Sequence, residues 1–180
     1  MHQQVNESHY DNLVYIICHG KLQNSMSSFN LEKIRGRTHN VHGYLEEVSD
    51  ENPVFKQKHE EYIIEEKNIK KLTEYANSTV VIAFSAEWCK DCHKNIPALD
   101  HISEATGIEI RIFGHLMRDA KDSKKRWRIP PSPVEVEEFD VIKIPHIVLL
   151  NQSGEIMGEI IENPPEGTSL EKAMLDLLER

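Results

Sequence analysis

The feature that most constrains the fold is a buried-strand pattern that runs directly into a pair of cysteines. Residues 80–84 (VVIAF) form a nearly continuous apolar run rich in β-branched side chains, which is typical of a central strand covered on both faces. Cys89 and Cys92 follow at once, and residues 90–106 carry apolar side chains at helical intervals up to Gly107. The sequence therefore predicts a strand, a short turn and a helix, with the cysteine pair at the helix start.

This placement at the helix start makes the two cysteines a candidate redox pair. Residues three apart on the first turn of a helix are neighbours, so Cys89 and Cys92 can close a disulfide without unwinding the helix. The first sulfur lies at the positive end of the helix dipole, beside free backbone N–H groups, which lowers the pKa of its thiol. We therefore expect Cys89 to be the nucleophile and Cys92 to be the resolving cysteine.

The pattern around this unit predicts an α/β fold. Helical spacing recurs over residues 65–76 and 168–180, and strand patterns are found over residues 61–64, 108–113, 147–150 and 155–161. Thr168 and Glu171 are spaced as a capping box for the last helix. Strands and helices alternate up to an irregular linker over residues 114–141, and two strands and a helix follow it. This order indicates a mixed central sheet with helices on both faces.

The domain organisation follows from a change of character near residue 60. Residues 61–180 are regularly patterned and form the predicted main domain. Residues 1–60 are less regular, although a break is indicated at residues 50–53 (DENP) and one helical face is formed by Val41, Tyr44, Leu45 and Val48. We expect residues 1–60 to be an N-terminal extension, partly helical and packed on the main domain.

Residues 84–92 (FSAEWCKDC), Pro97 and residues 143–145 (KIP) together resemble the thioredoxin family. The resemblance covers residues 61–180 and implies a thioredoxin-like fold and dithiol–disulfide exchange. Within it, Trp88 matches the family's aromatic residue before the first cysteine, and Pro97 matches its helix-kinking proline.

The resemblance also implies a substrate groove. Ile144 and Pro145 match the family's cis-proline loop, which faces the disulfide, so the bond between them should be cis. The backbone of Ile144 should then pair with an extended substrate segment, and Trp88, Ile144 and Pro145 are the expected substrate-binding residues.

The sequence departs from the family pattern at three places near the cysteines. Lys90 and Asp91 stand where common thioredoxins have Gly-Pro, and their opposite charges act in opposite directions on the Cys89 thiolate. Ala83 stands where those proteins have a buried acid that assists proton transfer at the resolving cysteine. His146 stands in place of the usual threonine after the cis-proline, and an imidazole there is a candidate acceptor for the proton of Cys92.

We expect this protein to reduce disulfides in protein substrates, with electrons from a thiol reductant or reductase, and to need no cofactor. A net charge of −9 argues against nucleic-acid binding. The early apolar run at residues 13–18 is too short and lacks the basic flank of a signal peptide, and no run approaches the ~20 residues of a membrane span. Because Cys18 leaves the cysteine count odd, a secreted disulfide scaffold is not indicated, and we expect a cytoplasmic protein with no membrane contact.

Other functions remain open at this point. In one alternative, the cysteine pair is half of a zinc site whose four ligands are completed by His93 and His146 or Cys18. No second closely spaced ligand pair is present in the sequence, so we assign no metal ligands. A thioredoxin-like binding or chaperone module is a further alternative. The basic residues around Trp127 form either a docking surface or, as we expect, a solvated helix face.

Overall fold

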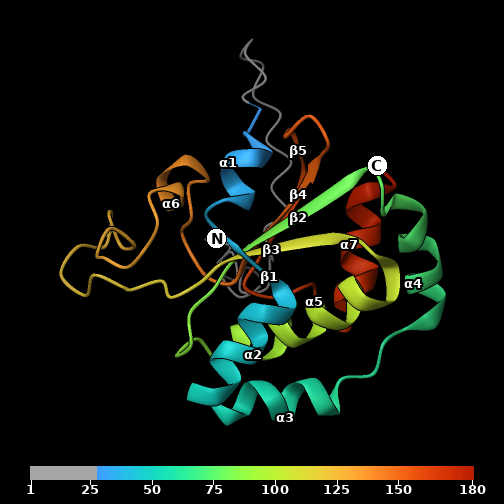
Figure 1. Ribbon diagram of the computed structural model, residues 1–180, viewed down its shortest axis with the longest axis horizontal. Coiled ribbons are helices and arrows are strands. Elements are labelled where there is room, and N and C mark those ends of the chain that lie inside the picture. The colour runs from blue at the N-terminus through green and yellow to red at the C-terminus, as the bar shows by residue number, and fades with distance from the viewer. Residues whose placement is uncertain (1–27) are drawn as a thin grey trace, which may run out of the picture.

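The structure, a computed structural model, describes residues 28–180, and in that range it contains a five-stranded mixed sheet of order β1-β3-β2-β4-β5 (Figure 1). β2 pairs in parallel with β3 and antiparallel with β4, while β1 and β5 are antiparallel to their neighbours. The strands are β1 (His39–Asn40), β2 (Thr79–Phe84), β3 (Glu109–Phe113), β4 (His146–Asn151) and β5 (Ile156–Ile161). The predicted α/β class with a mixed sheet is confirmed.

Helices cover both faces of this sheet. Figure 1 shows α2, α3, α4, α5 and α7 on one side and the short α1 and α6 on the other. Their bounds are α1 (Leu31–Arg35), α2 (Val41–Glu51), α3 (Pro53–Glu61), α4 (Glu66–Leu72) followed by the 3-10 turn η1 (Thr73–Tyr75), α5 (Cys92–Thr106), α6 (Glu135–Glu138) and α7 (Leu170–Leu178).

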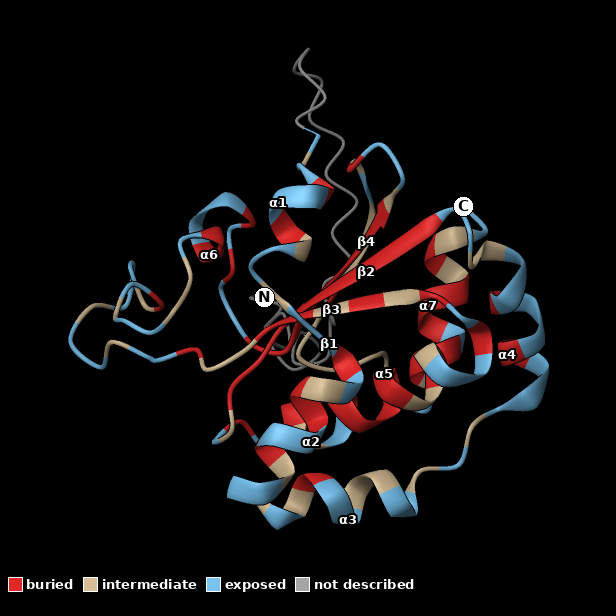
Figure 2. Cartoon of the chain, viewed as in Figure 1, coloured by how far each residue is buried: buried red, intermediate tan, exposed pale blue. Residues whose placement is uncertain are grey.

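The central strand β2 is buried along its whole length, as its apolar sequence predicts (Figure 2). On one face, the ring of Phe84 stacks on Phe113 at 4.9 Å between centroids and also contacts Phe139 near α6. On the other face, Ala83 pairs with Ile112 and Ile147 in the neighbouring strands. Since a strand buried on both faces cannot shift register without exposing apolar side chains, its end is a fixed platform for the following turn.

That turn leads into α5, which begins at Cys92, two residues later than expected. The backbone N–H of His93 donates to the carbonyl of Cys89 at 3.1 Å, so the hydrogen bonds of the helix already start at the first cysteine. Pro97 lies inside α5, and Gly107 ends it with a left-handed φ of 76°. A glycine is needed at this position because that conformation disfavours side chains.

Residues 28–60 are integrated with this framework. The predicted helical face of α2 is buried, and Asn52 separates α2 from α3 by accepting a hydrogen bond from the Val54 N–H at 3.1 Å. β1 extends the sheet at its edge, and α2 and α3 pack on α5. The domain boundary at residue 60 stays a prediction, and Cys18 with the run at residues 13–18 lies outside the described residues.

Two local predictions are wrong for a common reason, which is the buried carboxylate of Glu171. The strand predicted over residues 61–64 does not form, because Glu61 ends α3 and the Tyr62 hydroxyl donates to Glu171 at 2.7 Å, which ties residues 62–64 to α7. The Glu171 carboxylate is thereby occupied and does not take part in a capping box. The N-cap of α7 is Ser169 rather than Thr168, and its side chain accepts from the Lys172 N–H at 3.3 Å.

Within residues 28–180, no helix is both long and apolar enough to cross a membrane.

Candidate active site

Cys89 and Cys92 form a disulfide in the turn between β2 and α5, with their Cα atoms 5.2 Å apart. The two residues differ in access to solvent. Cys89 is 6% exposed, whereas Cys92, the first residue of α5, is 0% exposed. Of the two cysteines, only Cys89 retains exposed surface.

Backbone groups surround the Cys89 sulfur. The N–H of Cys92 donates to Cys89 Sγ at 3.2 Å, and the carbonyl oxygen of Ile144 lies 3.5 Å from the same sulfur. In the dithiol form, an N–H donor at this distance favours the thiolate of Cys89 over the thiol. The position of Ile144 places the loop before β4 directly over the redox pair.

That loop contains a cis peptide bond between Ile144 and Pro145. The carbonyl of Pro145 accepts from the N–H of Glu162 at 2.8 Å, so the end of β5 holds the loop in place. The structure thus brings together the disulfide, Ile144 and Pro145. A second cis bond, between Pro130 and Pro131, lies in the linker and was not anticipated.

A stacked tryptophan pair flanks the site. Trp88 is 46% exposed, and its Nε1–H donates to the carbonyl of Leu116 at 3.1 Å. Its ring lies at 6.2 Å between centroids from Trp127, which donates to the carbonyl of Ile142, just before the cis-proline loop, at 3.2 Å. Trp127 is therefore buried against the site, and no helix forms around it. The expected solvated helix face is wrong in this respect, and the signal overlooked was a tryptophan among charged residues.

An asparagine pair that the sequence did not single out fixes the interior of the cysteine motif. Asn163 donates to the Asp91 carboxylate at 2.9 Å, and the side chain of Asn95 donates to the Asp91 carbonyl at 2.9 Å. Asn95 also donates to the carbonyl of Glu162 at 3.0 Å. These bonds join the start of α5 to the end of β5. Lys90, by contrast, is exposed.

The two histidines near the motif do not contact the sulfurs. His93 is half-buried, with Nε2 2.8 Å from the carbonyl of Glu87 and its ring against Phe55. His146 is buried, lies 3.2 Å from Glu159 and pairs in register with Phe84, on the face opposite Ala83. The expectation that His146 accepts the proton of Cys92 stays untested, but its recorded partner is Glu159.

The zinc alternative for the cysteines gains no support from this arrangement. In the part of the chain that the structure describes, three groups of potential ligands come close together, and none of them includes a cysteine. His93 and His146 each have another partner, and Cys18 lies outside the described residues.

The sequence model of a family described as thioredoxin matches residues 39–175. No curated protein matches the sequence at a comparable level of significance.

Among solved structures, an HIV epitope-scaffold aligns with a TM-score of 0.59 at 17% identity, over 84% of this chain and 98% of that one. A protein of unknown function from Pseudomonas aeruginosa aligns with a TM-score of 0.48 at 18% identity, over 85% and 91%. The pneumococcal exposed lipoprotein thioredoxin from Streptococcus pneumoniae aligns with a TM-score of 0.40 at 19% identity, over 61% and 90%.

Proposed function

Because this chain belongs to the thioredoxin family, we propose that it is a thiol–disulfide oxidoreductase that reduces disulfides in protein substrates through Cys89 and Cys92. The observation that supports the proposal is a closed cysteine pair at the end of the central strand, in which Cys89 alone retains exposed surface and lies against the cis-proline loop. A purely structural disulfide requires neither this unequal exposure nor a cis-proline loop beside it. We place this activity in a reducing, cytoplasmic setting, with an external dithiol or a reductase as the electron donor.

The first step is attack by the reduced protein. The Cys89 thiolate, favoured by the Cys92 N–H, attacks one sulfur of the substrate disulfide. A bond forms between Cys89 and that sulfur, the substrate S–S bond breaks, and the other substrate sulfur leaves as a thiolate that takes up a proton.

The second step closes the protein disulfide. Cys92 loses its proton, and its thiolate attacks the sulfur of Cys89, which releases the second substrate thiolate. In total, two electrons and two protons pass to the substrate, and the external dithiol then reduces the Cys89–Cys92 bond. The 5.2 Å separation of the Cα atoms lets this bond form without movement of α5.

Substrate contact falls on the surface around Cys89. Trp88 and Ile142 are exposed apolar side chains near the disulfide, connected through Trp127. The backbone of Ile144 at the cis bond offers hydrogen bonds to an extended segment. Such a surface suits a partly unfolded polypeptide. Its backbone groups can form hydrogen bonds with the extended main chain of the substrate, and its apolar rim can contact the substrate's side chains.

Reduction of insulin by dithiothreitol tests the proposal directly. The wild-type protein should accelerate precipitation of the insulin B chain, and Cys89→Ser should abolish the acceleration because no nucleophile remains. Cys18→Ser serves as the matched control and should keep the full rate. An unchanged rate in Cys89→Ser would overturn the assignment of the nucleophile, and a wild-type protein without activity would favour a binding or chaperone module.

A further inference from the structure

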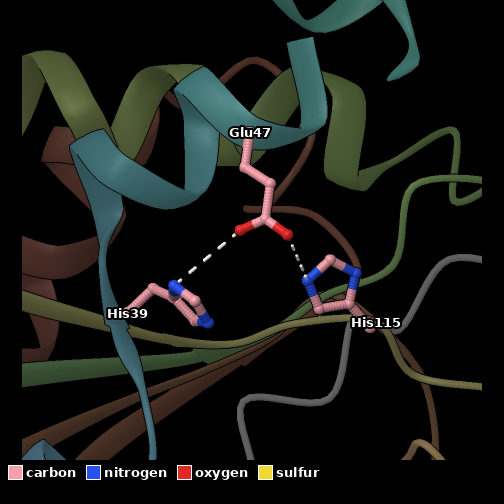
Figure 3. Close-up of side chains that lie close together, drawn as sticks. All are labelled: His39, Glu47 and His115. Atoms are coloured by element: carbon pink, nitrogen blue, oxygen red, sulfur yellow. Dashed lines mark ion pairs between the residues drawn. The ribbon is translucent and has the colours of Figure 1, made fainter. Parts of the chain in front are cut away.

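Three ionisable side chains from three elements converge close to the turn that carries the cysteines. His39 lies on β1, Glu47 on α2 and His115 in the loop after β3, and the Glu47 carboxylate points between the two imidazole rings (Figure 3). The distance from Glu47 to His115 Nε2 is 3.2 Å, and the distance from Glu47 to His39 Nδ1 is 3.8 Å. We propose that these three residues bind a zinc-class divalent cation.

The donor set and its spacing suit such an ion. Two imidazole nitrogens and one carboxylate oxygen are the ligands of open zinc sites, in which water takes the remaining position. With bonds of about 2.0–2.2 Å, ligand atoms of a tetrahedral site lie about 3.3 Å apart. One ligand atom from each of His39, Glu47 and His115 lies within 4.8 Å of the other two, so small side-chain rotations complete the geometry.

Glu87 supplies an independent observation. Its carboxylate forms an ion pair with Nδ1 of His115, the ring nitrogen that does not face Glu47. A metal-binding histidine commonly donates its other ring N–H to a carboxylate, which fixes the tautomer and leaves a lone pair for the ion. The buried Oε1 of Glu87 has no hydrogen-bond partner among the described residues, so it is placed to accept the Nδ1–H of His115 when Nε2 binds an ion. The cation would then lie between the Nε2 lone pair and the Glu47 carboxylate. The competing arrangement is a doubly protonated His115 that bridges both carboxylates.

The site is open to an ion from solution. The side chains of His39, Glu47 and His115 are 53%, 45% and 33% exposed. His39 and His115 also line a cavity of ≈ 410 Å³ together with Gly114 and Pro131, which leaves room for water ligands. This exposure distinguishes the group from a closed network of core ion pairs.

The close approach of the three elements depends on Gly114. A Cβ atom at this position would lie 2.2 Å from the Tyr44 ring, so only glycine lets the loop after β3 pass this close to α2. The loop thereby sets His115 beside Glu47. On its other side, His115 contacts Glu87, two residues before Cys89, so the proposed site adjoins the redox turn without including a sulfur.

Zinc titration of the oxidised Cys18→Ser protein tests the inference, because this form presents no free thiolate to the metal. Competition with a chromophoric chelator should show one zinc ion bound per protein molecule, and addition of EDTA should release it. Glu47→Gln and His39→Ala should each weaken binding by at least about 100-fold, and Glu87→Gln by about 10- to 100-fold. In wild-type protein, zinc should shift the imidazole NMR signals of His39 and His115.

Two variants serve as matched controls. Glu46→Gln removes the same charge from the neighbouring position of α2, and Glu104→Gln disrupts the two other groups of potential ligands. Both should retain the zinc affinity of this site, and unfolding curves recorded in EDTA should show a cooperative transition for every variant. Absence of saturable zinc binding, or binding that survives Glu47→Gln and His39→Ala, would overturn the proposal and leave His115 as a proton-bearing bridge between carboxylates.

Discussion

At the scale of single residues, the chemistry depends on the different surroundings of two chemically identical thiols. Cys89 receives a backbone N–H and keeps some access to solvent, whereas Cys92 is enclosed at the start of α5. The N–H favours the thiolate at the first position, and burial restricts the second to an intramolecular attack. The sequence pattern predicted these unequal surroundings, because it placed Cys89 in the turn before the helix and Cys92 in its first turn; the roles of nucleophile and resolving cysteine stay predictions.

A mixed disulfide should accumulate when the second step is removed. In a reduced Cys92→Ser protein, Cys89 still attacks, but nothing displaces the substrate, so a disulfide-containing peptide should remain attached. Intact-mass measurement should find one peptide per protein, and fragmentation should place it on Cys89. The Cys89→Ser, Cys92→Ser double variant is the control, and an adduct that persists in it would identify Cys18 as the reactive thiol.

Cys92 must lose its proton before it can attack the mixed disulfide. Ala83 is buried at the position of the family's assisting acid, and an alanine cannot accept a proton. Without a base, the rate of the resolving step should rise with pH up to the ordinary pKa of a thiol, about 8.5. His146, the alternative base, is held at Glu159 across the sheet from Ala83.

Ala83→Asp should therefore accelerate resolution. At about pH 7, we expect the single-turnover rate of the resolving step to rise by about 10- to 100-fold, with the initial attack unchanged. Burial raises the pKa of the new carboxyl above its unfolded value, so the variant should lose stability as pH rises, by about 1–3 kcal/mol. Ala83→Asn is a control of similar size without a base. Equal rates in the two variants would show that proton removal does not limit the step.

At the scale of secondary-structure elements, α5 connects the redox turn to the N-terminal helices through a buried carboxylate. Asp100 of α5 lies 3.0 Å from His59 of α3 and 3.4 Å from His42 of α2. The Asp100 carboxylate raises the pKa of His42 first through a hydrogen bond and then through its charge, with smaller contributions from Glu46 and Glu104. The packing of α2 on α5 is thereby coupled to pH.

The sign of this coupling is determined by the raised pKa. Because folding favours protonated His42, the stabilisation is present below the unfolded pKa of about 6.5 and is lost as pH rises through the higher folded value. Asp100→Asn should lower the His42 titration midpoint in NMR, and the stability advantage of wild type over the variant should be larger at about pH 5.5 than at about pH 8.5. Glu46→Gln should lower the midpoint less. An identical midpoint in wild type and Asp100→Asn would contradict this account.

Elements with strong periodicity could be predicted from the sequence, and elements set by long-range contacts could not. β2 and α5 carry continuous patterns, and both form where expected, with the helix start displaced by two residues. Residues 62–64 have the composition of a strand, but the hydrogen bond of Tyr62 to Glu171 holds them to α7. Trp127 was misjudged for the same kind of reason, since its charged neighbours gave no sign of the distant Trp88 ring that buries it.

At the scale of the whole molecule, the sheet order brings together groups that are far apart in the sequence. β2 lies between β3 and β4, so the turn after β2, the loop after β3 and the cis-proline loop before β4 meet at one end of the sheet. The redox pair and its proline could be foreseen because family motifs mark them. The asparagine pair around Asp91 and the group of His39, Glu47 and His115 could not, because no local pattern links residues of separate elements.

An equilibrium titration against glutathione measures whether the Cys89–Cys92 pair is a reductant. A protein-disulfide reductase should titrate as one reversible two-electron couple, with a potential more negative than the biochemical cytosolic glutathione poise of about −220 to −260 mV. The fraction oxidised, followed by mass after thiol alkylation, should fit this curve in Cys18→Ser protein as in wild type. A pair that does not exchange with glutathione, or one whose potential lies well above the glutathione poise, would contradict the account of this protein as a reductase.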